Sequence, residues 1–299
     1  MNDNYQMLPS FAHDRSVSLY CKGYTELTSC ALATATRKPL FALKRCASKI
    51  IRRRMEMSGY EKEILAVLNK LAYGVSNHDV FADFLTITSY DMLVLSENAY
   101  KNLGGKIDEN KHNSRICEIE KIKSKYNNEL LLKATMILIK ALTEERKDFL
   151  GTVFEELGLG DARNGQFFTP NHISKIMAKL SLEGLPELSA LNDKKYITIA
   201  DPCIGSGRLA IEACEELRNK GFSYWQYFVE GRDISRLPAL MSYLQLSLLG
   251  VPAMVFWGDS LAMKNYEEFP TPIALLQGWL PKIYIKPEDF KRKIEISLF

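Results

Sequence analysis

The stretch that decides the fold is Asp201–Gly207, with the sequence DPCIGSG. It follows the apolar run YITIA at residues 196–200, and it precedes a helical pattern over residues 210–217. A strand that turns on two glycines, Gly205 and Gly207, into a helix lets a ligand approach the bare backbone. The helix N-terminus adds free N–H groups and partial positive charge. The stretch therefore predicts a strand–turn–helix unit that binds a ligand.

Asp201 stands at the end of the predicted strand, beside this glycine turn. A carboxylate there repels a pyrophosphate but attracts an ammonium group. We therefore expect a nucleotide that carries an amino acid, such as S-adenosylmethionine, in preference to NAD.

The same strand–helix style continues after the turn. Strand-like runs at residues 225–229 and 253–257 flank a helical pattern at 237–248. Such alternation is typical of βαβ units and a parallel sheet. Because helical patterns dominate from Leu43 onward, we predict a mainly helical N-terminal domain over residues 1–147 and an α/β domain over residues 148–299.

Two further acids follow the second and third predicted strands. Asp233 can accept hydrogen bonds from ribose hydroxyls, and its alternative role is a charge that favours the start of the next helix. Asp259, in the sequence GDSL at residues 258–261, can accept from an adenine amine, or it can cap a turn. Ligands bind at the carboxyl ends of strands in open parallel sheets, where all three acids fall.

An upstream motif, QFFTP at residues 166–170, has a helix-start pattern. Thr169 can cap the helix, Pro170 suits its first position, and Phe168 can pack on Ile173. We expect the buried face of this helix to consist of its periodic apolar residues, which are Ile173, Ile176, Met177 and Leu180.

Together these motifs resemble the cofactor motifs of N6-adenine DNA methyltransferases, with the greatest likeness to modification (methylase) subunits of type I restriction systems. The sequence DFLG at residues 148–151, followed by Phe154-Glu155, is similar to the lead-in of those subunits. The resemblance covers residues 148–261 by motif and residues 1–147 by architecture only. It implies an α/β, S-adenosylmethionine-dependent methyltransferase-like Rossmann sheet, incomplete here, preceded by an all-helical domain.

The resemblance also implies roles for individual residues in binding S-adenosyl-L-methionine. Phe168 and Thr169 would line its methionine end, and Asp201 would hold its amino group. The remaining roles are backbone access at Gly205 and Gly207, ribose binding at Asp233 and adenine binding at Asp259. Cys203 receives no chemical role.

The Asn/Asp-Pro-Pro-aromatic motif, with which this family holds the target amine, is not found. Its nearest substitute is Thr271-Pro272-Ile273, and Tyr266 and Trp279 are aromatic residues that could stack on a base. We therefore name no catalytic residue.

The segment after Asp259 is short for the expected sheet. We predict one more strand at residues 283–285 and an exposed sheet edge that a partner subunit or a second copy covers.

The charge distribution adds a candidate DNA contact. Residues 37–54 carry eight basic side chains and no acid, whereas the whole chain carries only +3. This cluster is either a phosphate-binding surface or a solvated helix face.

Composition excludes other classes. No apolar run reaches about 18 residues, the length of a membrane helix, so no membrane partner is expected. The six cysteines form no CxxC pair, so we expect no metal and reduced thiols in a cytoplasm.

Three hypotheses stay open at this point: a DNA adenine methyltransferase that works with another subunit, a non-catalytic S-adenosylmethionine-binding sensor, DNA-binding module or accessory subunit, and an unrelated nucleotide-binding protein.

Overall fold

The structure is a computed structural model, and it describes residues 59–159, 169–185, 196–283 and 293–297. All of these described residues belong to one compact unit. The basic cluster at 37–54 and Phe168 lie outside the described residues. The boundary predicted between residues 147 and 148 stays a prediction.

The predicted sheet is present. Its strands are β1 (Tyr196–Asp201), β2 (Tyr227–Asp233), β3 (Ala253–Asp259), β4 (Lys264–Pro270) and β5 (Lys293–Ser297). Their order across the sheet is β4-β3-β2-β1-β5, and only β4 runs antiparallel to its neighbour. The fold class predicted from the alternating pattern is therefore confirmed, with an antiparallel edge strand that the pattern did not indicate.

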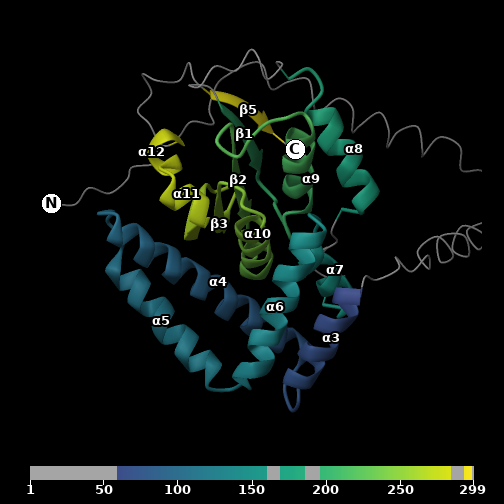
Figure 1. The fold of residues 1–299 in the computed structure, drawn as a ribbon, viewed down its shortest axis with the longest axis vertical. Coiled ribbons are helices and arrows are strands. Elements are labelled where there is room, and N and C mark those ends of the chain that lie inside the picture. The colour runs from purple at the N-terminus through teal and green to yellow at the C-terminus, as the bar shows by residue number, and fades with distance from the viewer. Residues whose placement is uncertain (1–58, 160–168, 186–195, 284–292, 298–299) are drawn as a thin grey trace, which may run out of the picture. The chain divides into compact units, whose positions relative to one another are not determined.

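Ten helices are described in this part of the chain. They are α3 (Gly59–Leu71), α4 (Asn77–Asn102), α5 (Glu109–Lys123), α6 (Asn128–Glu144), α7 (Phe149–Glu156), α8 (Asn171–Ser181), α9 (Arg208–Asn219), α10 (Arg236–Leu248), α11 (Pro272–Leu276) and α12 (Trp279–Ile283). The segment before the sheet is thus helical over α3–α6, as the sequence predicts (Figure 1).

The strands bury both faces because their side chains alternate. On β2, Tyr227 and Val229 join the main core together with residues of α9 and α10, while Phe228 joins a smaller core with Trp279 of α12. Helix α10 also packs against α4, which brings the N-terminal helices onto the sheet (Figure 1).

Two sequence predictions about packing are wrong. In α8, Ile173, Ile176 and Leu180 are exposed rather than buried. Helix α8 packs on α9 and buries its small residues Ser174 and Ala178 instead, which allow close approach of the two helices.

The strand predicted at residues 283–285 is wrong at Ile283, and residues 284 and 285 lie outside the described residues. Ile283 ends helix α12, and the additional strand is β5, about ten residues later. Helix α12 forms there because Trp279 is buried against Phe228 of the sheet, a contact that no local pattern reveals. Whether the sheet is incomplete stays a prediction.

A buried ion pair joins α7 to the glycine turn. Asp148 has a fully buried side chain, and its Oδ2 accepts from Arg208 Nε at 2.7 Å and from Ser206 Oγ at 2.6 Å. Its Oδ1 accepts from Gly151 N and from Gln245 Nε2 of α10, at 2.8 and 2.9 Å. Four segments therefore meet on one carboxylate.

We predict that Asp148→Asn lowers the free energy of unfolding by about 3 kcal/mol, because the buried Arg208 loses its 2.7 Å carboxylate partner and keeps only the longer, 3.4 Å contact with Glu155. Urea denaturation measures this. The matched control is Asp91→Asn, which breaks the more exposed pair with Lys123 at 2.8 Å and should cost less than about 1 kcal/mol. Equal losses in the two variants would contradict the role given to Asp148.

Candidate functional site

The site begins where β1 ends. Asp201 is 2% exposed, and its Oδ1 accepts from Cys203 N at 3.0 Å. Burial raises the pKa of the Asp201 carboxyl to about 7. The hydrogen bond from the Cys203 backbone lowers this pKa in part, and the nearby charge of Asp233 adds a smaller upward shift. A desolvated carboxylate of this kind favours a cationic partner, which would stabilise its ionised form.

The glycine turn has the backbone conformation for which glycine is needed. Gly205 and Gly207 have φ values of 57° and 89°, in the left-handed region. A Cβ on Gly207 would also lie 3.1 Å from the Ser242 Cβ, so α9 starts in close contact with α10. The turn therefore exposes backbone rather than side chain at the start of α9.

The end of β2 is tied directly to this turn. Asp233 Oδ2 accepts from Gly205 N at 2.9 Å, and its Oδ1 accepts from Ser235 N at 2.8 Å. Burial raises the pKa of Asp233, and these two backbone bonds oppose the shift. The turn can pack against β2 here because residue 231 is glycine: a Cβ there would lie 2.1 Å from Ile204 Cδ1.

The end of β3 joins the same place. Asp259 Oδ1 accepts from the backbone N–H groups of Leu261 and Ala262, at 2.8 and 2.9 Å. The neighbouring Ser260 hydroxyl donates to the carbonyl of Pro202 in the glycine turn. The structure therefore brings Asp201, Asp233 and Asp259 to one edge of the sheet, as the sequence predicts for parallel strands.

The donor set at this edge fits an aminoacyl nucleoside. Within the described residues, Oδ2 of Asp201 and Oδ2 of Asp259 have no hydrogen bond, so each can accept one from a ligand. Each oxygen of Asp233 accepts a single backbone bond and can take a second hydrogen from a ribose hydroxyl.

Sequence reasoning missed the apolar residues that follow two of these acids. Ile234 is 58% exposed and Leu261 is 98% exposed, and each directly follows the strand-end region that holds an acid. Exposed aliphatic side chains beside carboxylates suit a flat, partly apolar ligand such as a purine. Their only sequence signal is an apolar residue in an otherwise polar turn.

Cys203 lies in the glycine turn, close to two of the carboxylates. Burial, together with the nearby Asp201 and Asp233, raises the pKa of its thiol. The thiol form of Cys203 is therefore favoured at neutral pH.

Thr169 lies close to this edge but does not cap α8. Pro170 occupies the N-cap position without a side-chain hydrogen bond, and the Thr169 carbonyl accepts from Arg208 Nη1 at 2.7 Å. The capping prediction is therefore wrong, because Arg208 fixes this residue through its backbone. A role for Thr169 in binding stays a prediction, as does that of Phe168.

The substitute acceptor motif is not at the site. Thr271 is fully buried, its hydroxyl donates to Val251 O, and it accepts from Ala253 N at the opposite end of β3. Trp279 is also buried, 1% exposed, so it cannot stack on a base. Tyr266, by contrast, is 44% exposed on β4.

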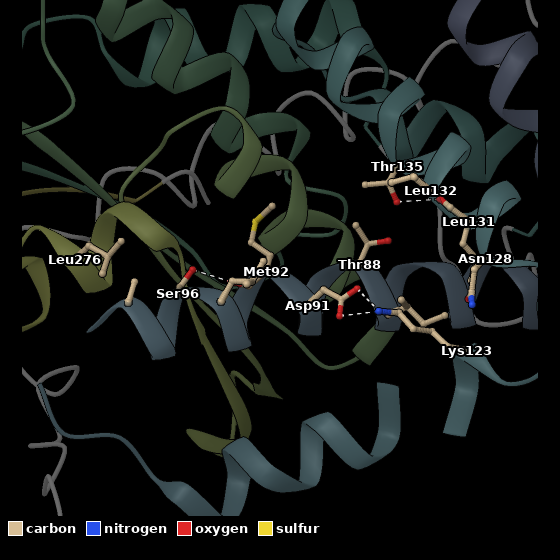
Figure 2. Close-up of a pocket in the computed structure, with 13 residues that line it drawn as sticks. Thr88, Asp91, Met92, Ser96, Lys123, Asn128, Leu131, Leu132, Thr135 and Leu276 are labelled. Carbon is tan, nitrogen blue, oxygen red and sulfur yellow. Dashed lines mark hydrogen bonds and ion pairs between the residues drawn. The ribbon is translucent and has the colours of Figure 1, made fainter. Parts of the chain in front are cut away.

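A separate groove of about 580 Å³ lies between α4 and α6 and is closed at one end by Leu276 (Figure 2). Its walls are mainly apolar, and its charged residues, Asp91 and Lys123, pair with each other. It shares no residue with the strand-end carboxylates, so we do not place the site there.

Two other classes of site find no support in the described ranges. No group of three or more His, Cys, Asp or Glu side chains there is arranged to hold a metal ion. No described helix combines the length and apolarity that crossing a membrane requires.

Two solved structures are similar to this chain. One is a candidate class I S-adenosylmethionine-dependent methyltransferase from Listeria monocytogenes, at 16% identity and a TM-score of 0.44, with 70% of this chain and 56% of that chain covered. The other is a type I restriction-modification methyltransferase subunit from Streptococcus thermophilus, at 15% identity and a TM-score of 0.35, with 70% and 59% covered. The chain therefore spans somewhat more than half the length of each.

The sequence model of the N-6 DNA methylase family matches residues 145–274. The match includes Asp148, the glycine turn and all three strand-end carboxylates. Over residues 145–274 the chain is therefore similar to the N-6 DNA methylase family.

Proposed function

We propose that this chain binds S-adenosyl-L-methionine at the carboxyl edge of its sheet, as a DNA N6-adenine methyltransferase-like protein of the restriction-modification type. The observation that carries the proposal is that Asp201 and Asp233 both accept from backbone N–H groups of one glycine turn, while Ser260, next to Asp259, donates to the same turn. When bound, the cofactor supplies a methyl group activated by its sulfonium.

Each of the three carboxylates has a distinct part in this proposal. Asp201 holds the amino group, because a buried carboxylate gains most from a cation. Asp233 accepts from the ribose hydroxyls, and Asp259 accepts from the adenine amine through its open Oδ2. Gly205 and Gly207 leave room for the ligand along the turn, with Thr169 and Phe168 assigned to the methionine end by family resemblance.

The wider setting is also part of the proposal. DNA is the substrate class that the family match supports, and the basic residues at 37–54 are candidate phosphate contacts. A partner subunit or a second copy would cover the sheet edge. The unpaired cysteines among the described residues suit a reducing cytoplasm.

A second candidate function is cofactor binding without turnover, as a sensor, DNA-binding module or accessory subunit. It is favoured by the burial of Thr271, which removes the nearest substitute for an amine acceptor. Under this candidate, the chain alone transfers no labelled methyl group to adenine in duplex DNA while still binding the cofactor. Transfer that Asp201→Asn abolishes would instead establish the chain as an enzyme.

We predict that Asp201→Asn weakens binding of S-adenosylhomocysteine, which keeps the amino acid and the adenosine, by at least about tenfold. The reason is the loss of a charge-assisted hydrogen bond. Asp233→Asn should weaken it to a similar degree, whereas Asp91→Asn, on the α4–α6 groove, should leave it unchanged. Isothermal titration calorimetry gives these affinities. If the wild-type chain binds NAD and not S-adenosylhomocysteine, the proposal is wrong.

The affinity for S-adenosylhomocysteine should also depend on pH, in the direction set by the titration of Asp201. The pKa of Asp201 near 7 means that the free protein carries a proton there below pH 7, which the ligand ammonium must displace. Affinity should therefore rise about tenfold per pH unit up to pH 7 and then level off. The slope should vanish in Asp201→Asn. A wild-type affinity that is flat between pH 5.5 and 7 would refute this linkage.

A further inference from the structure

A row of alternating cations and aromatic rings runs from the start of α10 along the β3–β4 hairpin. The Arg236 guanidinium carbon lies 5.9 Å from the centroid of the Trp257 ring. The Trp257 ring meets the Tyr266 ring edge to face, with centroids 5.3 Å apart. Lys264 Nζ lies 5.6 Å from the Tyr266 centroid. We call these four side chains the hairpin ladder.

The hairpin ladder begins beside the candidate cofactor site. Arg236 follows Asp233 by three residues, and Trp257 precedes Asp259 by two. Trp257 Nε1 also donates to the carbonyl of Ile234 at 3.1 Å. A molecule that lies on the ladder is therefore adjacent to the edge where the three carboxylates converge.

The outer half of the ladder is open to solvent. Tyr266 is 44% exposed, and Lys264 is exposed at the first position of β4. In the described part of the chain, no carboxylate lies within 4.0 Å of Lys264 Nζ, so its charge is available to a ligand. The hairpin turn between β3 and β4 adds exposed apolar side chains, Leu261 and Met263.

Two of the neighbouring acids, Glu118 and Glu267, are paired with residues other than Lys264. Glu118 pairs with Arg236 at 3.0 Å, and Glu267 pairs with Arg115 at 3.2 Å and accepts from Tyr90 at 2.9 Å. Glu118 of α5 thus holds the Arg236 end of the ladder, and Glu267 of β4 is held by Arg115 and Tyr90 of the N-terminal helices. These contacts also hold Arg236 and β4 in place, which keeps the rings in fixed positions.

We propose that the hairpin ladder binds a single-stranded or unstacked segment of nucleic acid. A base stacks on the exposed Tyr266 ring, and a backbone phosphate contacts Lys264. Rings that alternate with cations are the pattern by which proteins hold unpaired bases, because every base has a π-face and every linkage a negative charge. The inference rests on the proposed function, since it gives that function a substrate surface next to the cofactor edge.

The test uses the full-length chain and fluorescence anisotropy with a labelled 20-nucleotide single strand of mixed sequence and the matching duplex. Tyr266→Leu should weaken single-strand affinity by about fivefold or more, the usual loss for one base–aromatic contact. Tyr266→Phe, which keeps the ring, should restore affinity to within about twofold. The matched control is Tyr73→Leu, a 95% exposed tyrosine outside the ladder, which should have no effect.

Lys264 has its own readout. Lys264→Gln should reduce the slope of log affinity against log salt by about 0.7, the value for one phosphate contact on a single strand. Lys70→Gln, on α3, should leave the slope unchanged. Polyglutamate should not compete with the oligonucleotide as well as an unlabelled strand does, because it lacks bases.

The outcomes separate this inference from the cofactor proposal. Equal single-strand affinity in Tyr266→Leu and Tyr73→Leu, or full competition by polyglutamate, would overturn the ladder. S-adenosylhomocysteine binding should be unchanged in Tyr266→Leu, because Tyr266 is not among the cofactor residues. Failure of the wild-type chain to bind S-adenosylhomocysteine would overturn the proposed function, while the ladder would still be judged by its own variants.

Discussion

The buried pair between Asp148 and Arg208 is the contact on which the rest of the site depends. One carboxylate orders the N-terminus of α7, the glycine turn and α10 at once, through Gly151, Ser206 and Gln245. Arg208 extends the same network to the Thr169 carbonyl. A buried charge is costly without its partner, so removing either member of the pair should destabilise this part of the fold. The position of the glycine turn therefore depends on the buried polar side chains of Asp148, Arg208 and Gln245.

Above that network, the chemistry of the site follows from desolvation. The carboxyls of Asp201 and Asp233 are both largely removed from solvent, and this burial raises the pKa of each. The backbone N–H groups of Cys203, Gly205 and Ser235 offset part of this cost without neutralising the acids. A site with buried carboxylates and no described basic side chain bonded to them is prepared for a ligand that brings its own positive charge.

Much of this site could be predicted from the sequence because its information is local. Short apolar runs that alternate with helical runs, and an acid after each apolar run, place Asp201, Asp233 and Asp259 on one edge without any knowledge of packing. The failures all involve partners distant in sequence. The apolar stripe of α8 indicated a helix but not that α9 would select its opposite, small-residue face. The polar sequence of β4 gave no strand signal. The strand forms with its Glu267 carboxylate paired with Arg115 of α5, a residue distant in sequence. Asp148 stands out in the sequence only as the first residue of the DFLG lead-in, and its pairing with Arg208, sixty residues away, had no sequence signal.

The central claim is that three strand-end carboxylates and one glycine turn form a single site for an aminoacyl nucleoside. A crystal structure of the chain with S-adenosylhomocysteine tests it most directly. The account predicts the ligand at the carboxyl edge of β1–β3, with its amino group on Asp201, its ribose on Asp233 and its adenine amine on Asp259. Ligand density in the α4–α6 groove, or at the sheet edge without contact to Asp201 and Asp233, would contradict it.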